Sequence, residues 1–74
     1  MNYTVQLTPE AEKEFKGLGR SVQPLLVRRM TDIAQNPHQH GDALRGEFHG
    51  YRRAHVSRYR IIWEVNEAAR TVVV

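Results

Sequence analysis

The sequence contains no cysteine. This absence excludes disulfide bonds, thiolate catalysis and every cysteine-ligated zinc site, and it is typical of proteins that work in a reducing compartment. The chain also lacks any run approaching the roughly 18 apolar residues of a membrane-spanning helix, and its N-terminus lacks the apolar segment of a signal peptide. We therefore expect a cytoplasmic protein that does not bind a membrane.

Linker-like and low-complexity segments are absent too, with only 5 glycines and 3 prolines among 74 residues. A chain this short leaves room for one small domain and excludes a multi-domain enzyme. Its 41% hydrophobic and 26% charged residues are typical of a globular protein. We expect a single domain over residues 1–74, with a thin core.

The charge is unevenly distributed. The net charge is +3, and five arginines oppose one acidic residue, Glu47, between Arg45 and Arg60. This window therefore carries all of the excess positive charge. It predicts either a surface for an anion, above all nucleic acid, or an ordinary solvated basic face.

Local patterns predict the first two elements. Alternating apolar residues over positions 3–7 indicate a strand. Thr8 then supplies an N-cap and Pro9 the first residue of a helix, which we expect to end at Gly17 or Gly19.

A second helix should follow, with Ser21 as its N-cap and Pro37 just after its end. Segment 38–50 is polar and rich in glycine, so we expect a connecting loop anchored by Leu44 and Phe48. The apolar stripe of this helix is predicted to comprise Val22, Leu25, Leu26, Met30, Ile33 and Ala34.

The rest of the chain predicts three strands. Residues 51–56 and 59–65 are β-branched and aromatic, and the dipeptide Ser57-Arg58 between them fits a hairpin turn. A last strand is expected over residues 70–74. The order β-α-α-β-β-β predicts an α+β fold, a mostly antiparallel sheet with two helices packed on one face.

A two-residue turn sets the register of this hairpin. His55 then lies opposite Arg60, and side chains sort onto two faces. One face, apolar enough to lie under the helices, carries Ala54, Val56, Tyr59, Ile61, Trp63 and Val65. The other carries Tyr51, Arg53, His55, Arg60, Ile62 and Glu64. An arginine and a histidine directly opposite one another repel when both are charged, so this second face favours a bound anion over an open solvated surface.

Phosphodiester cleavage needs a base, an acid and cations around the phosphate. Arg53 and Arg60 can supply only the cations, because guanidinium groups stay protonated. His55 can transfer a proton, bind phosphate, or serve only as a pairing or packing histidine. Glu64 is a possible base, although an ion pair with an arginine is the favoured interpretation. Tyr51 can stack on a base or pack at the sheet edge.

His38 and His40, with Asp42 as a third ligand, suggest a metal site only weakly, because a polar loop lacks the fixed spacing of ligands on a helix. We expect no metal and no cofactor.

The chain resembles the RelE/ParE superfamily of bacterial and archaeal toxins over essentially its whole length. The resemblance lies in the order and spacing of several segments. These are Tyr3-Thr4-Val5, residues 11–15, Asn36-Pro37, Leu44-Arg45-Gly46, Gly50-Tyr51-Arg52-Arg53 and residues 57–65.

The RelE-like branch implies a compact toxin of a type II toxin–antitoxin system that cleaves mRNA in the ribosomal A site and is inhibited by an antitoxin. By this resemblance, Arg60 is the phosphate-stabilising arginine, and Arg52, Arg53 and His55 lie in a basic strand. Asp42 lies where some relatives carry a glutamate base. The predicted RNA-binding residues are Arg45, Arg52, Arg58 and Tyr51.

Family members usually continue with an arginine and then a tyrosine or histidine, whereas this sequence stops at Val74. We therefore expect it to lack the C-terminal segment of the family. The leading hypothesis is a metal-independent endoribonuclease whose partners are the ribosome, mRNA and an antitoxin. The alternatives are a ParE-type inhibitor of DNA gyrase and a degenerate toxin that binds only its antitoxin.

Overall fold

The computed structural model of the chain describes residues 3–74. The elements, in chain order, are β1 (Thr4–Gln6), α1 (Pro9–Lys16), α2 (Gln23–Gln35), β2 (Asp42–Ala43), the short 3-10 helix η1 (Gly46–Phe48), β3 (Tyr51–Val56), β4 (Tyr59–Asn66) and β5 (Thr71–Val73). The expected α+β class is confirmed. Within the described residues, no helix is long and apolar enough to cross a membrane.

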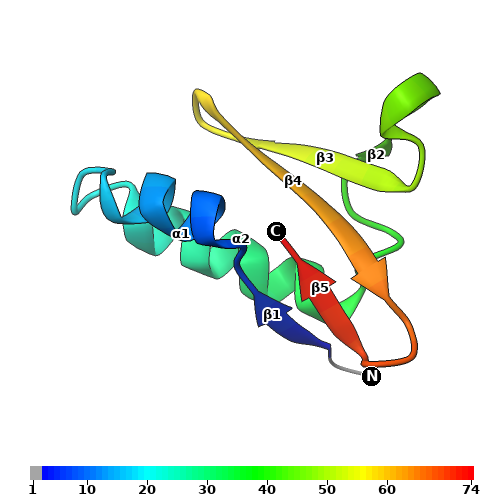
Figure 1. Cartoon of the computed structure of the whole chain (residues 1–74). Coiled ribbons are helices and arrows are strands. Elements are labelled where there is room, and N and C mark those ends of the chain that lie inside the picture. Colours follow the sequence, from blue (N-terminus) through cyan, green and yellow to red (C-terminus); the bar gives the residue numbers. More distant parts are fainter. Residues whose placement is uncertain (1–2) are drawn as a thin grey trace.

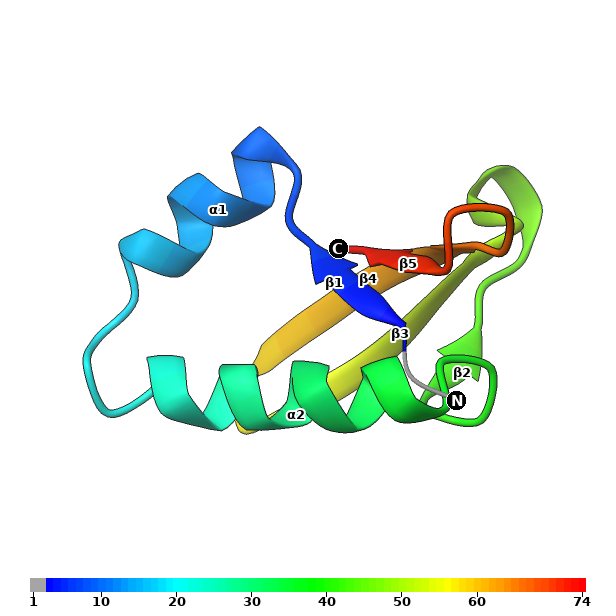
Figure 2. The ribbon, with the colours of Figure 1, turned by 90° about the horizontal axis from the view of Figure 1, so that it is seen from below.

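The sheet has five strands in the order β1-β5-β4-β3-β2. Strands β1 and β5 are parallel, and every other neighbouring pair is antiparallel. Helix α2 runs across one face of this sheet and α1 lies beside it (Figures 1 and 2). The opposite face of the β3–β4 hairpin is left without a helix.

Helix α1 begins where the sequence predicts. The hydroxyl of Thr8 accepts a hydrogen bond of 3.1 Å from the Ala11 N–H, and Gly17 is the C-cap residue. The prediction that Ser21 caps the second helix is wrong, because α2 starts two residues later with no side-chain cap. The Gln23 side chain instead donates to the carbonyls of Phe15 and Leu18, which joins the two helices.

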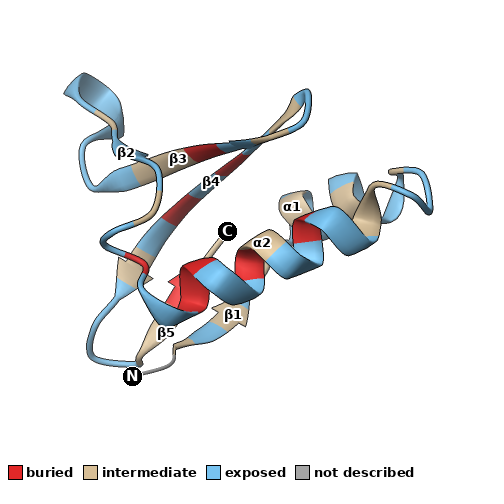
Figure 3. Cartoon of the chain, turned by 180° about the vertical axis from the view of Figure 1, so that it is seen from behind, coloured by how far each residue is buried: buried red, intermediate tan, exposed pale blue. Residues whose placement is uncertain are grey.

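The core lies between α2 and the sheet, where red segments face each other in Figure 3. It comprises Leu26, Met30, Ile33, Ala54, Ile61, Trp63 and Val72. Trp63 is fully buried, and its indole N–H donates to the Pro37 carbonyl at 3.2 Å. Leu25, expected in the apolar stripe, is 51% exposed, so the buried stripe of α2 is narrower than predicted.

The hairpin register is confirmed: His55 pairs with Arg60, and the turn residues are Ser57 and Arg58. Ser57 has a φ of 57°, in the left-handed region, so the turn forms without glycine or asparagine.

The expected loop over residues 38–50 is more ordered than predicted, because it contains β2 and η1. Gly41 has a φ of +63°, and a Cβ there would lie 2.1 Å from the Arg53 carbonyl oxygen. Glycine therefore lets this segment approach β3 closely enough for β2 to pair with it. Phe48 is 54% exposed and does not anchor the segment, whereas Leu44 is half-buried.

Candidate functional site

The helix-free face of the β3–β4 hairpin, which we term the outer face, carries the candidate site. Its side chains come from three cross-strand pairs: His55 with Arg60, Arg53 with Ile62, and Tyr51 with Glu64. Between these pairs, Ala54 and Ile61 point to the core on the other side of the sheet. Successive side chains of a strand point to opposite faces of the sheet, so the residues of the outer face alternate with residues that pack in the core.

Arg53, His55 and Arg60 form a cationic cluster next to the hairpin turn. His55 and Arg60 are exposed and Arg53 is half-buried. None of the three makes an ion pair with another residue of the described chain. Two arginines and a histidine that lack acidic partners attract an anion, and the guanidinium groups match the geometry of a phosphate.

Arg52 does not join this cluster, because it lies on the core side of β3. Its Nε donates to the His40 carbonyl at 2.9 Å and its Nη2 to the Gly41 carbonyl at 3.0 Å. These bonds hold the segment that leads into β2. Arg52 therefore positions this segment, a role that the number of arginines between residues 45 and 60 does not reveal.

The other two arginines of the basic window lie at opposite ends of the hairpin. Arg58 is an exposed residue of the turn next to the cluster. Arg45 follows the residue that hydrogen-bonds to Tyr51, so it lies near the start of β3, away from the turn.

The two candidate bases occupy different positions. Asp42 pairs with Arg53 across β2 and β3 and is exposed, so it lies beside the cationic cluster. Glu64 lies opposite Tyr51, two cross-strand pairs away from His55 and Arg60. The ion pair expected between Glu64 and an arginine is not formed within residues 3–74.

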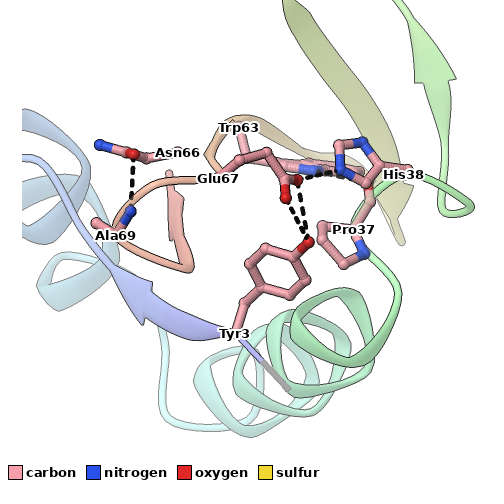
Figure 4. Close-up of polar contacts among 7 residues, drawn as sticks. All are labelled: Tyr3, Pro37, His38, Trp63, Asn66, Glu67 and Ala69. Carbon is pink, nitrogen blue, oxygen red and sulfur yellow. Dashed lines mark hydrogen bonds and ion pairs between the residues drawn. The ribbon is translucent and has the colours of Figure 1, made fainter. Parts of the chain in front are cut away.

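Asp42, one of the suggested metal ligands, lies beside the cationic cluster, whereas His38 lies at another site. His38 contacts Glu67 through its Nε2 at 2.5 Å, and the Tyr3 hydroxyl donates to the same carboxylate at 3.0 Å (Figure 4). Arg70 lies 4.6 Å from the centre of the Tyr3 ring. Across the described part of the chain, no group of three histidine, aspartate or glutamate side chains is arranged to hold a metal ion.

The contacts within the Tyr3–His38–Glu67 cluster shift the pKa values of Glu67 and Tyr3. Hydrogen bonds from His38 and Tyr3 hold the pKa of the Glu67 carboxyl below its ordinary value. Partial burial and the neighbouring Glu67 raise the pKa of the Tyr3 hydroxyl. The sequence does not reveal these contacts of Tyr3 and Glu67, because the partners come from distant parts of the chain.

A cavity of about 620 Å³ lies between α1, α2 and β4. Apolar side chains form most of its lining, among them Phe15, Leu26 and Met30, and Lys13, Glu14 and Arg60 also contribute. Helix α1 contains no buried residue, but its Phe15 packs against the core beside this cavity. No sequence signal located this cavity, because its lining residues also fit an ordinary core.

Comparisons with known proteins agree with this architecture. One similar structure is a chain of the toxin–antitoxin complex RelBE2 from Mycobacterium tuberculosis, with a TM-score of 0.89 and 27% identity over 99% of this chain and 91% of that chain. Another is a chain of the intact E. coli RelBE complex, with a TM-score of 0.84 and 22% identity over 96% of this chain and 88% of that chain.

The free E. coli toxin RelE, as a mutant with two arginines replaced by alanine, also matches. Its TM-score is 0.84, with 23% identity over 99% of this chain and 78% of that chain. The two E. coli matches show the shared fold alone. No curated protein matches the sequence. Residues 5–74 match the family described as the ParE toxin of the type II toxin–antitoxin system. The chain therefore belongs to the ParE toxin family of type II toxin–antitoxin systems, within the wider group of RelE/ParE-like toxins.

Proposed function

We propose that this toxin is a ribosome-dependent mRNA endonuclease. The observation that carries the proposal is the cationic cluster of Arg53, His55 and Arg60, which is exposed and has no ion pair within residues 3–74. Similarity to a chain of RelBE2 supports a RelE-type activity.

The proposed reaction is an attack of the RNA 2′-oxygen on the adjacent phosphorus. The P–O5′ bond breaks as the new P–O2′ bond forms, which leaves a 2′,3′-cyclic phosphate and a free 5′-hydroxyl. A base takes the 2′-hydroxyl proton and an acid protonates the leaving O5′. Arg53 and Arg60 stabilise the charge on the phosphorane, since they cannot exchange protons at working pH.

His55 is the proton-transfer group of the cluster, and Asp42 is the better-placed base. Asp42 faces Arg53 across β2 and β3, whereas Glu64 is separated from Arg60 by the Arg53–Ile62 pair. We assign the neighbouring Arg58 to RNA-backbone binding. Because Arg45 lies away from the turn, any contact it makes is with a more distant part of the RNA.

We further propose an acidic antitoxin as the partner. Similar chains come from toxin–antitoxin complexes. The cavity beside α1 can take the apolar face of a partner helix, and the net charge of +3 favours an acidic one. Such a partner inhibits the toxin when its carboxylates reach the cationic cluster.

A second candidate function is inhibition of DNA gyrase without RNA cleavage. The match to the ParE toxin family favours it. The same exposed arginines would then contact a protein surface. A third candidate is a toxin that binds only its antitoxin.

Two assays separate the candidates. Primer extension on a message translated in a cell-free system detects cleavage, and a supercoiling assay detects gyrase inhibition. Arg60→Ala should reduce cleavage by about 100-fold or more, because it removes one preorganised cation from the transition state. Arg28→Ala, which removes an exposed arginine of α2, is the matched control and should cleave normally.

Normal cleavage by Arg60→Ala would contradict the assignment of this arginine. Gyrase inhibition by a parent protein that leaves the message intact would establish the second candidate. An inactive parent that binds its antitoxin would establish the third.

A further inference from the structure

Two apolar side chains are exposed beside the cationic cluster. Ile62 is 41% exposed and Tyr51 is 36% exposed, although both belong to strands whose other face is packed. They lie in successive cross-strand pairs of the outer face, Ile62 opposite Arg53 and Tyr51 opposite Glu64. Diagonal neighbours of this kind are within reach of one another when one of them is aromatic.

The spacing of these pairs matches the dimensions of a nucleotide. Side chains two residues apart on one face of a strand are separated by about 6.8 Å. A phosphate held by His55 and Arg60 therefore has its sugar near the next pair and its base near Ile62 and Tyr51. The outer face thus changes from cationic to apolar within the span of a single nucleotide.

Glu64 makes the two ends of this surface opposite in charge. Its carboxylate is exposed, lies beside Tyr51 and forms no ion pair within residues 3–74. A carboxylate repels phosphate, so the backbone of a bound strand is driven toward Arg53 and Arg60. The uncharged base is left at the Tyr51 end.

From this arrangement, we propose that Tyr51 and Ile62 form a subsite for one unpaired RNA base, which stacks on the tyrosine ring. The inference rests on the proposed function, because it requires that the cationic cluster binds the adjacent phosphate. Stacking on an aromatic ring accepts every base, so this subsite holds the nucleotide in place without reading the sequence.

The test uses short single-stranded RNAs that cannot be cleaved, because the attacking 2′-hydroxyl is replaced by hydrogen. One RNA carries 2-aminopurine at the position to be stacked and the other carries an abasic site there. Fluorescence anisotropy gives the affinity of each RNA, and quenching of 2-aminopurine reports stacking. Titration with salt gives the number of phosphate contacts.

The parent should quench 2-aminopurine and bind this RNA more tightly than the abasic one. Tyr51→Ala should lose the quenching and weaken binding of the base-bearing RNA by roughly 5- to 150-fold, while its affinity for the abasic RNA and its salt dependence stay unchanged. Tyr51→Phe keeps the ring and should bind normally. Ile62→Ser should weaken binding in the same base-dependent way, and Leu25→Ser, at an exposed leucine of α2, is the matched control.

Two results distinguish the failure of this inference from that of the proposed function. Equal affinity of the parent for both RNAs, with a clear salt dependence, would overturn the base subsite and leave the phosphate role intact. Absence of binding to either RNA at low salt would overturn the base subsite, and loss of cleavage of the translated message as well would overturn the proposed function. A Tyr51→Ala variant that binds both RNAs normally but loses affinity for its antitoxin would assign this surface to a protein partner instead.

Discussion

Arg52 and Arg53 are neighbours in the sequence but act on opposite faces of β3. The guanidinium of Arg52 makes two hydrogen bonds to backbone carbonyls at 2.9 and 3.0 Å, whereas Arg53 lies on the outer face without an ion pair inside the described chain. Replacing each in turn by methionine keeps the long apolar stem and removes the charge. The pair therefore tests whether Arg52 serves the fold and Arg53 the proposed RNA binding.

Arg52→Met should lower the free energy of unfolding by about 2 kcal/mol. One of the lost bonds is partly buried and the other is exposed, so each contributes about 1 kcal/mol, below the usual value for a bond to a charged group. For a domain of this size, the loss lowers the Tm by roughly 8 to 16 °C. Arg53→Met breaks no such bond and should stay within about 0.5 kcal/mol of the parent.

In RNA binding we expect the reverse: Arg53→Met should be impaired and Arg52→Met should not. Arg53→Met should weaken binding to single-stranded RNA and reduce the slope of log K against log salt by about 0.7, the value for one phosphate contact. Arg52→Met should keep the slope of the parent. Circular dichroism measures unfolding and fluorescence anisotropy measures binding.

A fall in Tm for Arg53→Met as large as that for Arg52→Met would refute the assignment of the two faces. A loss of RNA affinity confined to Arg52→Met would refute it as well.

Three further predictions concern other parts of the chain. Gly41→Ala should destabilise the fold by about 2 to 4 kcal/mol, measured by urea unfolding, because its Cβ would lie 2.1 Å from the Arg53 carbonyl oxygen; an unchanged midpoint would show that β2 can shift freely. His55→Arg should abolish cleavage, because arginine cannot donate a proton; an active variant would leave this residue as a phosphate ligand. The lowered pKa of Glu67 predicts stability that is fully present above the ordinary pKa of 4.5 and is lost as the pH falls through the lower value in the folded state. Thermal unfolding across this acid range should therefore show a smaller loss for Glu67→Gln than for the parent, and equal losses would contradict the role of its contact with His38.

The hairpin was predictable from sequence because its pairing depends only on residues that are close together in the chain. A two-residue turn between alternating strands determines every cross-strand pair, and the pairs from Tyr51–Glu64 to Val56–Tyr59 follow from it. The two faces follow in turn, since successive side chains point in opposite directions.

The missed features depend on contacts between distant residues. Strand β2 has only two residues, and it forms where Gly41 approaches β3 and Arg52 holds the neighbouring carbonyls. The His38–Glu67 contact joins residues 29 positions apart, which no periodicity can reveal. Leu25 was misplaced because a helical stripe indicates which side is apolar but not how much of it the sheet covers.

The site itself was predictable only in part for the same reason. Alternation places Arg53, His55 and Arg60 on one face, but it does not reveal that the arginine beside them serves the fold. The arginine-rich window between residues 45 and 60 led us to predict Arg52 as a further RNA-binding residue. Its two bonds to carbonyls show that at least one arginine of this window has a structural role.

The division of β3 into two faces explains how so small a domain can hold two arginines and a histidine side by side. Repulsion between Arg53 and Arg60 acts at the exposed end of the hairpin, while Ala54 and Ile61 on the other face remain buried in the core. An anionic partner relieves this repulsion without any movement of the core. The proposed binding of RNA or of an acidic antitoxin would therefore stabilise the native state as well as occupy the site, because a ligand that binds only the native state shifts the folding equilibrium toward it.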